Sequence, residues 1–68
     1  MMLRKIVGQN IRALRKEKGW TQEKLAWSAK LTSDCLGSLE RGTVNVSIDA
    51  LERIAKSLGV EPKKLLEK

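Results

Sequence analysis

The segment "TQEKLAWSAKLTSDCLGSLERG", residues 21–42, decides the fold of this chain of 68 residues. It holds two short helical patterns, over residues 22–29 and 33–41, with almost nothing between them. A connection this short predicts that the two helices cross at a steep angle. The small side chains of Ala26 and Ala29 predict that the crossing is close, because a larger side chain at Ala26 would hold the second helix away.

Apolar residues recur at helical spacing on both sides of this pair, which predicts further amphipathic helices. Thr21, Thr32 and Ser47 are suited to cap the starts of three helices, and Pro62 fits the first position of the last one. The sequence therefore predicts an all-α chain. Its five predicted helices span residues 3–18, 22–29, 33–41, 48–58 and 62–67.

The charge of the chain is strongly positive. It has 14 Lys and Arg against 8 Asp and Glu, a net charge of +6 and a pI near 9.9. Residues 1–20 carry most of this excess, while the segment 33–41 is close to neutral. A basic balance of this kind is typical of nucleic-acid binding, although on charge alone a merely soluble basic protein fits as well.

Several functional classes are disfavoured by composition. Cys35 is the only cysteine and there is no histidine, which excludes an internal disulfide and suits a reducing cytoplasm. No apolar run approaches the ~18 residues of a membrane span. We therefore predict one domain over residues 1–68, with no metal, no cofactor, no catalysis, no membrane association and no evident small-molecule effector.

A short connection between two steeply crossing helices defines the helix-turn-helix, whose second helix enters the DNA major groove. Three stretches extend this match: "NIRALRKEKGWTQEKLA", "LTSDCLGSLERG" and "IDALERIAKSLGV". Together they resemble the lambda-repressor/Cro-like family, also called the xenobiotic-response-element family, over nearly the whole chain. The resemblance implies a compact bundle of five helices with the helix-turn-helix at the second and third.

The resemblance also implies roles for individual residues. Arg15 and Glu40 match a structural pair. The positions expected to read base edges are Ser33, Asp34, Gly37 and Ser38. Some positions are expected to contact phosphates by resemblance, and others because they are cations or polar groups near the third helix. Together these positions are Thr21, Gln22, Arg12, Lys30, Arg41, Thr43 and Asn45.

Some residues depart from the family pattern or allow more than one interpretation. Lys30 replaces the usual glycine of the turn, where a left-handed backbone would cost roughly 1 kcal/mol. Asp34 either accepts from a cytosine amino group or only favours the helix dipole. We expect Cys35 to be a small, half-buried apolar group and Trp20 to lie in the core. Trp27 covers an edge of the core, marks a partner surface or stacks near the DNA backbone.

These features predict a transcription regulator that binds double-stranded DNA as a homodimer on a palindromic operator, with half-sites about one helical turn (~34 Å) apart. Stand-alone phage-type repressors and restriction–modification controllers are the expected relatives. The predicted dimer surface is Val60, Leu65, Leu66 and the outer edge of the fourth helix, although Leu65 could instead complete the core. The alternative is a protein–protein adaptor of the same fold, which the uncharged loop over residues 42–47 and Trp27 favour.

Overall fold

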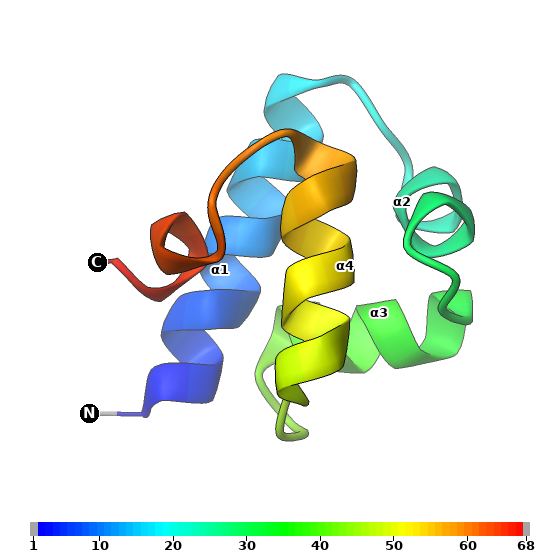
Figure 1. Ribbon diagram of the computed structural model, residues 1–68. Helices are drawn as coiled ribbons and strands as arrows, with labels where there is room; N and C mark the ends of the chain where they lie inside the picture. The colour runs from blue at the N-terminus through cyan, green and yellow to red at the C-terminus, as the bar shows by residue number, and fades with distance from the viewer. Residues whose placement is uncertain (1, 68) are drawn as a thin grey trace.

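The computed structural model describes residues 2–67 and contains four α-helices and one short 3-10 helix (Figure 1). They are α1 (Leu3–Glu17), α2 (Gln22–Ser28), α3 (Ser33–Arg41), α4 (Ile48–Leu58) and η1 (Pro62–Leu66). The all-α prediction is confirmed for this part of the chain, and the four α-helices lie within one residue of their predicted bounds. None of the helices described is long and apolar enough to cross a membrane.

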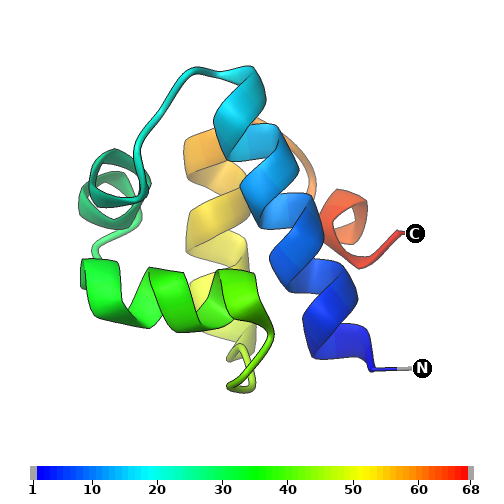
Figure 2. The same cartoon turned by 180° about the vertical axis from the view of Figure 1, so that it is seen from behind.

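The helix-turn-helix has the predicted geometry. Figure 2 shows α2 nearly end-on beside the start of α3, which runs across the view, so the two helices cross at a steep angle. Thr21 and Thr32 cap the two helices as predicted, since their hydroxyls accept from the backbone N–H of Lys24 (3.1 Å) and Cys35 (3.0 Å). The starts of both helices are therefore fixed by local hydrogen bonds.

The last predicted helix is wrong in type, because residues 62–66 form a 3-10 helix. The side-chain amide of Asn10 donates to the carbonyl oxygens of Leu65 (2.8 Å) and Glu67 (2.6 Å). These carbonyls gain their partner from α1, so the segment needs no further helical turn to satisfy them. Asn10 thereby ties the C-terminal segment to α1.

A single core joins all five elements. Its largest fully buried side chains are Val7, Ile11, Leu25, Leu36, Ile54 and Leu65. Leu65 is 0% exposed, so its predicted place in a dimer surface is wrong and its alternative place in the core is confirmed. Trp20 packs against the edge of this core, half-buried, with the ammonium groups of Lys18 and Lys24 5.3 and 5.2 Å from its ring.

The contact between α1 and α3 depends on Gly8, which the sequence did not single out. A Cβ at this position would lie 2.7 Å from the carbonyl oxygen of Glu40 and closer still to that of Leu39. These are backbone atoms of α3, so they cannot move aside as a flexible side chain would. The absence of a side chain at Gly8 therefore sets how closely α3 approaches α1.

The turn between α2 and α3 is left-handed at Lys30, where φ is 61°. The predicted strain of a non-glycine residue at this position is confirmed. The guanidinium of Arg53, from α4, donates to the Lys30 carbonyl at 3.4 Å. The strained turn is thus attached to α4 rather than left free.

Candidate DNA interface

A buried polar cluster fixes the start of α2 against α1 and α3. Arg15 Nε lies 2.7 Å from Glu40 Oε2, and a second guanidinium nitrogen donates to Oε1 at 3.1 Å. The third nitrogen donates to the Trp20 carbonyl at 2.7 Å. Both charged residues are buried, at 9% and 8% exposure. The predicted structural pair is confirmed, and its bidentate geometry fixes both distance and angle between α1 and α3.

Gln22 joins this cluster. Its side-chain amide donates to Glu40 Oε1 at 3.0 Å, so a buried carboxylate on α3 holds the first residue of α2. Its carbonyl oxygen lies beside Gly37, 3.6 Å from where a Cβ would stand. The residue predicted to touch a phosphate is therefore positioned at the edge of α3, half-buried rather than free in solvent.

The first turn of α3 is exposed on every side. Thr32, Ser33, Asp34 and Cys35 are all solvent-accessible, which places Ser33 and Asp34 where they were predicted. The expectation of a half-buried Cys35 is wrong, because the helix start projects beyond the core that its later residues contact. Cys35 therefore belongs to the surface that α3 presents.

The C-terminal half of α3 is less open than predicted. Gly37 is buried, so its predicted exposure is wrong: the guanidinium of Arg41 lies 3.3 Å from its Cβ position, and Gln22 lies on the other side. Arg41 Nη2 donates to the hydroxyl of the half-buried Ser38 at 3.2 Å. The long side chain of Arg41 thus folds back along α3 and gives its outer face a cation.

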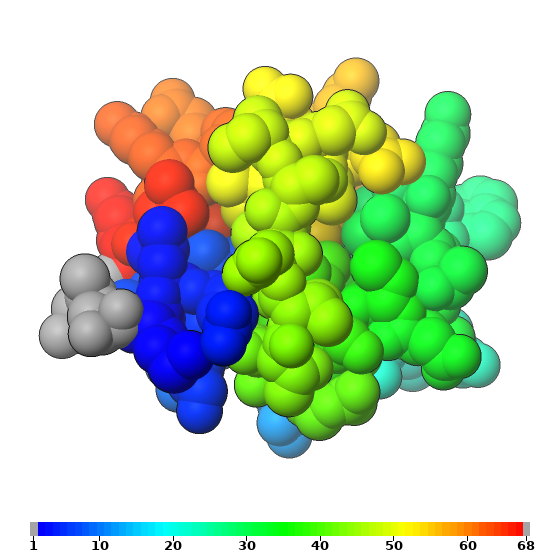
Figure 3. Space-filling model, turned by 90° about the horizontal axis from the view of Figure 1, so that it is seen from below, coloured from blue at the N-terminus to red at the C-terminus, as the bar shows by residue number. Residues whose placement is uncertain are grey.

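The loop over residues 42–47 gains positive charge from α1. Arg4 donates to the Asn45 side-chain oxygen at 3.3 Å. Lys5 packs so closely against Gly42 that a Cβ there would lie 2.8 Å from its Cγ, and the left-handed φ of 72° also favours glycine. Thr43 donates its hydroxyl to the Ser38 carbonyl at 3.2 Å. Figure 3 shows the start of α1 (blue), this loop (yellow-green) and α3 (green) next to one another.

The sequence could not reveal the contact between Arg4 and Asn45, which are 41 positions apart.

The two remaining predicted phosphate contacts differ in their placement. Arg12 is exposed one turn after Gly8, on the side of α1 that turns toward α3. Lys30 instead lines a pocket between the end of α2 and α4, away from Gln22 and Arg41. The structure therefore separates Lys30 from the other predicted contacts.

An exposed apolar face lies beside this surface. We use the name for the large exposed side chains Met2, Leu3, Val44, Ile48 and Leu66. Leu3, Ile48 and Leu66 line one groove of about 350 Å³, together with Val46, the buried Val7 and Leu51, and the polar Arg4 and Asn45 at its edge toward the loop over residues 42–47. Leu66, predicted to lie at a dimer surface, is 41% exposed here, while Val60 is half-buried against the core. Ile48, at the outer edge of α4, is 73% exposed.

Trp27 does not cover the core edge that was one of its interpretations, because it is 84% exposed. Among residues 2–67 no group of acidic, histidine or cysteine side chains is placed to hold a metal ion. The polar groups around α3 are hydroxyls, an amide, one free carboxylate and several cations. Their chemistry suits hydrogen bonding to base edges and phosphates.

The geometry of α2 and α3 defines a helix-turn-helix protein, and the comparison with known families agrees. The family described as "Helix-turn-helix domain" matches residues 6–67. The chain belongs to this family, whose match runs through all five elements. The family resemblance inferred from the sequence is confirmed.

Individual relatives include regulators of two kinds. The chain is 46% identical over 66 residues to the control protein C.BamHI of Bacillus amyloliquefaciens, covering 96% of this chain and 82% of that protein. It is 44% identical over 55 residues to the immunity repressor protein of Bacillus phage phi105, covering 81% and 38%. The crystal structure of the restriction-modification controller protein C.AhdI from Aeromonas hydrophila matches with a TM-score of 0.88 at 39% identity, over 91% of this chain and 94% of that one.

Proposed function

We propose that this helix-turn-helix regulator binds double-stranded DNA as a homodimer, with α3 in the major groove of each half-site. The observation that carries the proposal is the exposed first turn of α3, a helix whose last turn is fixed to α1 and α2 by the buried contacts of Arg15, Glu40 and Gln22. A reading helix has to be fixed in orientation, because hydrogen bonds to base edges tolerate little misplacement. The buried cluster supplies that constraint from three elements.

Base reading falls to short side chains in this proposal. Ser33 and Ser38 hydroxyls donate or accept at almost any base edge, so they specify weakly alone. Asp34 has no hydrogen-bond or ion-pair partner among residues 2–67, so its carboxylate is free to accept from a cytosine amino group. Cys35 adds a small group to the same surface. Because these side chains are short, the helix backbone can approach the groove floor closely.

Phosphate contacts would form a border around α3. Arg41 and Gln22 flank it directly, and Thr21 and Arg12 lie toward α1 and α2. On the other side, Thr43 and Asn45 contribute polar groups, and Arg4 provides the charge that the loop lacks. Side-chain cations near phosphates release counterions, so binding should weaken steeply as salt rises.

The proposed dimer forms through the apolar face. An apolar groove beside Leu3, Ile48 and Leu66 is the kind of surface that a soluble protein covers with a partner. In a two-fold interface the same surface of each copy contacts that of the other. A side chain that protrudes from one copy can therefore enter the groove of the other, and the reverse contact forms as well. In the proposed interface, Ile48 rather than Leu65 lies at the centre.

Replacing Ile48 with glutamate should therefore convert the protein to a monomer while leaving its fold intact, because the side chain is 73% exposed. Sedimentation across a range of concentrations measures the change. Trp27→Glu is the matched control, since it also puts a carboxylate at a large exposed apolar site. Dimers that persist in Ile48→Glu, or are lost only in Trp27→Glu, would contradict this interface.

Among regulators of this class, we propose a control protein of a restriction–modification system rather than a phage repressor. The similarity to C.BamHI extends over 96% of this chain at 46% identity and that to C.AhdI over 91% at 39% identity, whereas the similarity to the phage immunity repressor extends over 81% at 44% identity. The two control proteins therefore match more of this chain than the phage repressor does. Deleting or overproducing the protein beside a restriction–modification operon would test this assignment through changes in transcript level.

The rival proposal is an adaptor that binds protein rather than DNA. The 84% exposure of Trp27 favours it, since tryptophan is highly buried on average in folded proteins. It makes the opposite prediction for salt, because protein contact through an apolar side chain releases no condensed counterions. The first experiment below separates the two.

The test is selection from a randomised duplex library at two salt concentrations, followed by sequencing of the bound fraction. We expect a palindromic site whose affinity falls steeply with salt. Ser33→Ala and Asp34→Ala should change the selected bases, with about 1–3 kcal/mol lost at an affected position. Ser57→Ala, a similar change on α4, should leave the site unchanged. Weak binding without any enriched sequence would overturn the proposal in favour of the adaptor.

A further inference from the structure

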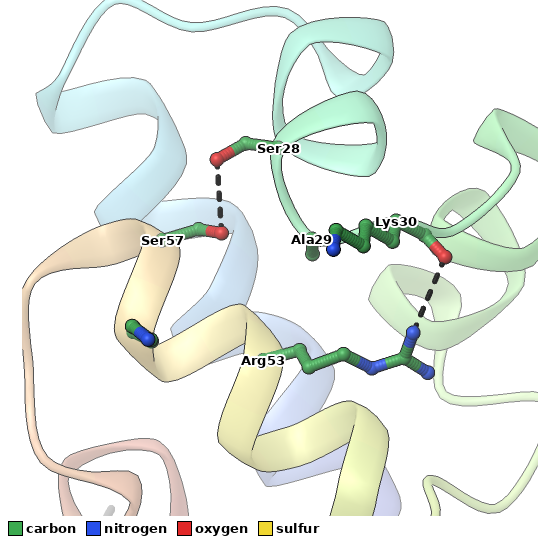
Figure 4. Close-up of a pocket in the computed structure, with 6 residues that line it drawn as sticks. Ser28, Ala29, Lys30, Arg53 and Ser57 are labelled. Atoms are coloured by element: carbon green, nitrogen blue, oxygen red, sulfur yellow. Dashed lines mark hydrogen bonds between the residues drawn. The ribbon is translucent and has the colours of Figure 1, made fainter.

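A polar pocket lies at the opposite end of α2 from Gln22, between that end and α4. It measures about 440 Å³, and its lining residues are Ser28, Ala29, Lys30, Arg53, Lys56 and Ser57. Figure 4 shows Ser28 and Ser57 joined across one side, while Arg53 reaches toward the backbone of Lys30. Pockets of about 300–1,000 Å³ accept small molecules, so size does not exclude a ligand.

All the charged side chains that line this pocket are positive. Lys30, Arg53 and Lys56 line it, and no carboxylate does. Within residues 2–67 neither lysine forms an ion pair, so both ammonium groups are available. Asp49 pairs with Arg53 at 3.3 Å but has a side chain 78% exposed to water. The pocket therefore presents a positive surface that its own residues do not neutralise.

Arg53 is held in place with one donor unused. Its guanidinium nitrogens contact Asp49 and the Lys30 carbonyl, so the side chain spans from α4 to the turn. Its Nε is buried and has no hydrogen-bond partner in the described chain. An N–H group of this kind is costly to leave unsatisfied, and an oxyanion in the pocket is a partner it could meet after a small shift of the side chain.

The opposite wall adds neutral donors. The Ser28 hydroxyl donates to that of Ser57 at 3.0 Å, which leaves the Ser57 hydrogen free to point elsewhere. The pocket thus combines two ammonium groups, one guanidinium N–H and one hydroxyl hydrogen. This set of donors matches the oxygens of a phosphate group, which accepts several hydrogen bonds and carries negative charge.

A purely structural account is also available for these cations. Lys30 and Lys56 lie near the C-terminal ends of α2 and α4, where the helix dipole favours positive charge. That account explains the signs of Lys30 and Lys56. It does not explain why three cations from two elements line one pocket, or why a buried Arg53 donor there lacks a partner.

We propose that the pocket formed by Lys30, Arg53, Lys56 and the Ser28–Ser57 pair binds a phosphate group. The phosphate belongs either to a small phosphorylated molecule or to the DNA backbone flanking the operator. In both cases the ligand bridges α2 to α4, at the end of the helix-turn-helix that lacks the buried ion pair. Binding of a free phosphorylated molecule does not depend on the regulator proposed above, whereas binding of a backbone phosphate rests on that proposed function.

The experiment titrates inorganic phosphate into the full chain at constant ionic strength, with chloride as reference, and follows the backbone amides by NMR. We expect saturable shifts at Ser28, Lys56 and Ser57. Lys56→Gln and Lys30→Gln should weaken binding by about threefold each, as expected for partly exposed charges. Lys64→Gln, which removes the same charge from η1, should bind phosphate like the unmodified chain.

A second arm separates the two sources of phosphate. Binding of the same variants to a random-sequence duplex is measured as a function of salt. If the pocket holds a backbone phosphate, the slope of log affinity against log salt falls by about one in Lys56→Gln. If it holds a free phosphorylated molecule, the slope is unchanged. Phosphate shifts that do not saturate, or that are equal in Lys56→Gln and Lys64→Gln, overturn the proposal whatever the slope shows.

Discussion

The two ends of α2 are attached to the rest of the protein in different ways. At the first end, Gln22 donates to the buried carboxylate of Glu40, which is itself paired with Arg15. At the other end, an exposed hydroxyl pair and a 3.4 Å contact from Arg53 to the strained turn are the links to α4. The buried contacts at the first end fix the orientation of α3 relative to α1 and α2. The exposed contacts at the other end leave a pocket open between α2 and α4.

Removing the buried carboxylate of Glu40, at the first end of α2, should cause the largest loss of stability. In Glu40→Ala the guanidinium of Arg15 loses its partner in a buried site, which should lower the free energy of unfolding by about 3–5 kcal/mol. Urea denaturation measures the loss. The double variant Arg15→Met with Glu40→Leu is the control, because apolar replacement of both charges should recover most of the stability. A double variant no more stable than Glu40→Ala would contradict a role for the unpaired charge.

Adding one methyl group at the α1–α3 contact should have an intermediate effect. In Gly8→Ala the new Cβ would overlap the carbonyl oxygens of Leu39 and Glu40, so α3 has to shift away. We expect a loss of about 1–3 kcal/mol, although alanine is the better helix former. Gln9→Ala, exposed in the same helix, should stay within about 0.5 kcal/mol. Thermal unfolding of both variants tests the difference, and equal midpoints would show that the contact is not tight.

A substitution at the other end of α2, in the Lys30 turn, should change the stability least and should increase it. Lys30→Gly removes the left-handed strain at φ 61° and should stabilise the fold by about 1 kcal/mol. The same change from lysine to glycine at the exposed Lys16, inside α1, should destabilise it by a similar amount. Chemical denaturation of the two variants measures both signs. Destabilisation by Lys30→Gly would mean that the lysine side chain contributes more than its backbone costs.

The sequence predicted the features that neighbouring residues determine. The helix bounds and the caps at Thr21, Thr32 and Ser47 follow from a few adjacent positions, so they could be predicted and are confirmed. The Arg15–Glu40 pair, which is 25 positions apart, came from the family resemblance rather than from spacing. Local chemistry therefore gave the elements, and the resemblance gave the one long-range contact.

The errors lie where distant segments meet. Gly37 was expected to be exposed, but Arg41 and Gln22 cover it. Leu65 was assigned to the dimer surface with the core as its alternative, and α1 and α4 enclose it in the core. Cys35 was expected to be half-buried, but the first turn of α3 extends past the core. The contacts made by Asn10 and Arg4 join segments more than 40 positions apart. No pattern within one helix indicates such contacts.

Leu65 has a consequence for how the protein is made. It is among the largest fully buried side chains, and the Asn10 amide anchors its carbonyl to α1. A nascent chain that stops before η1 would leave a cavity between α1 and α4, and cavities of that kind cost several kcal/mol. Such a chain should be much less stable than one that includes residue 65, so we expect the stable fold to form only after η1 has been synthesised.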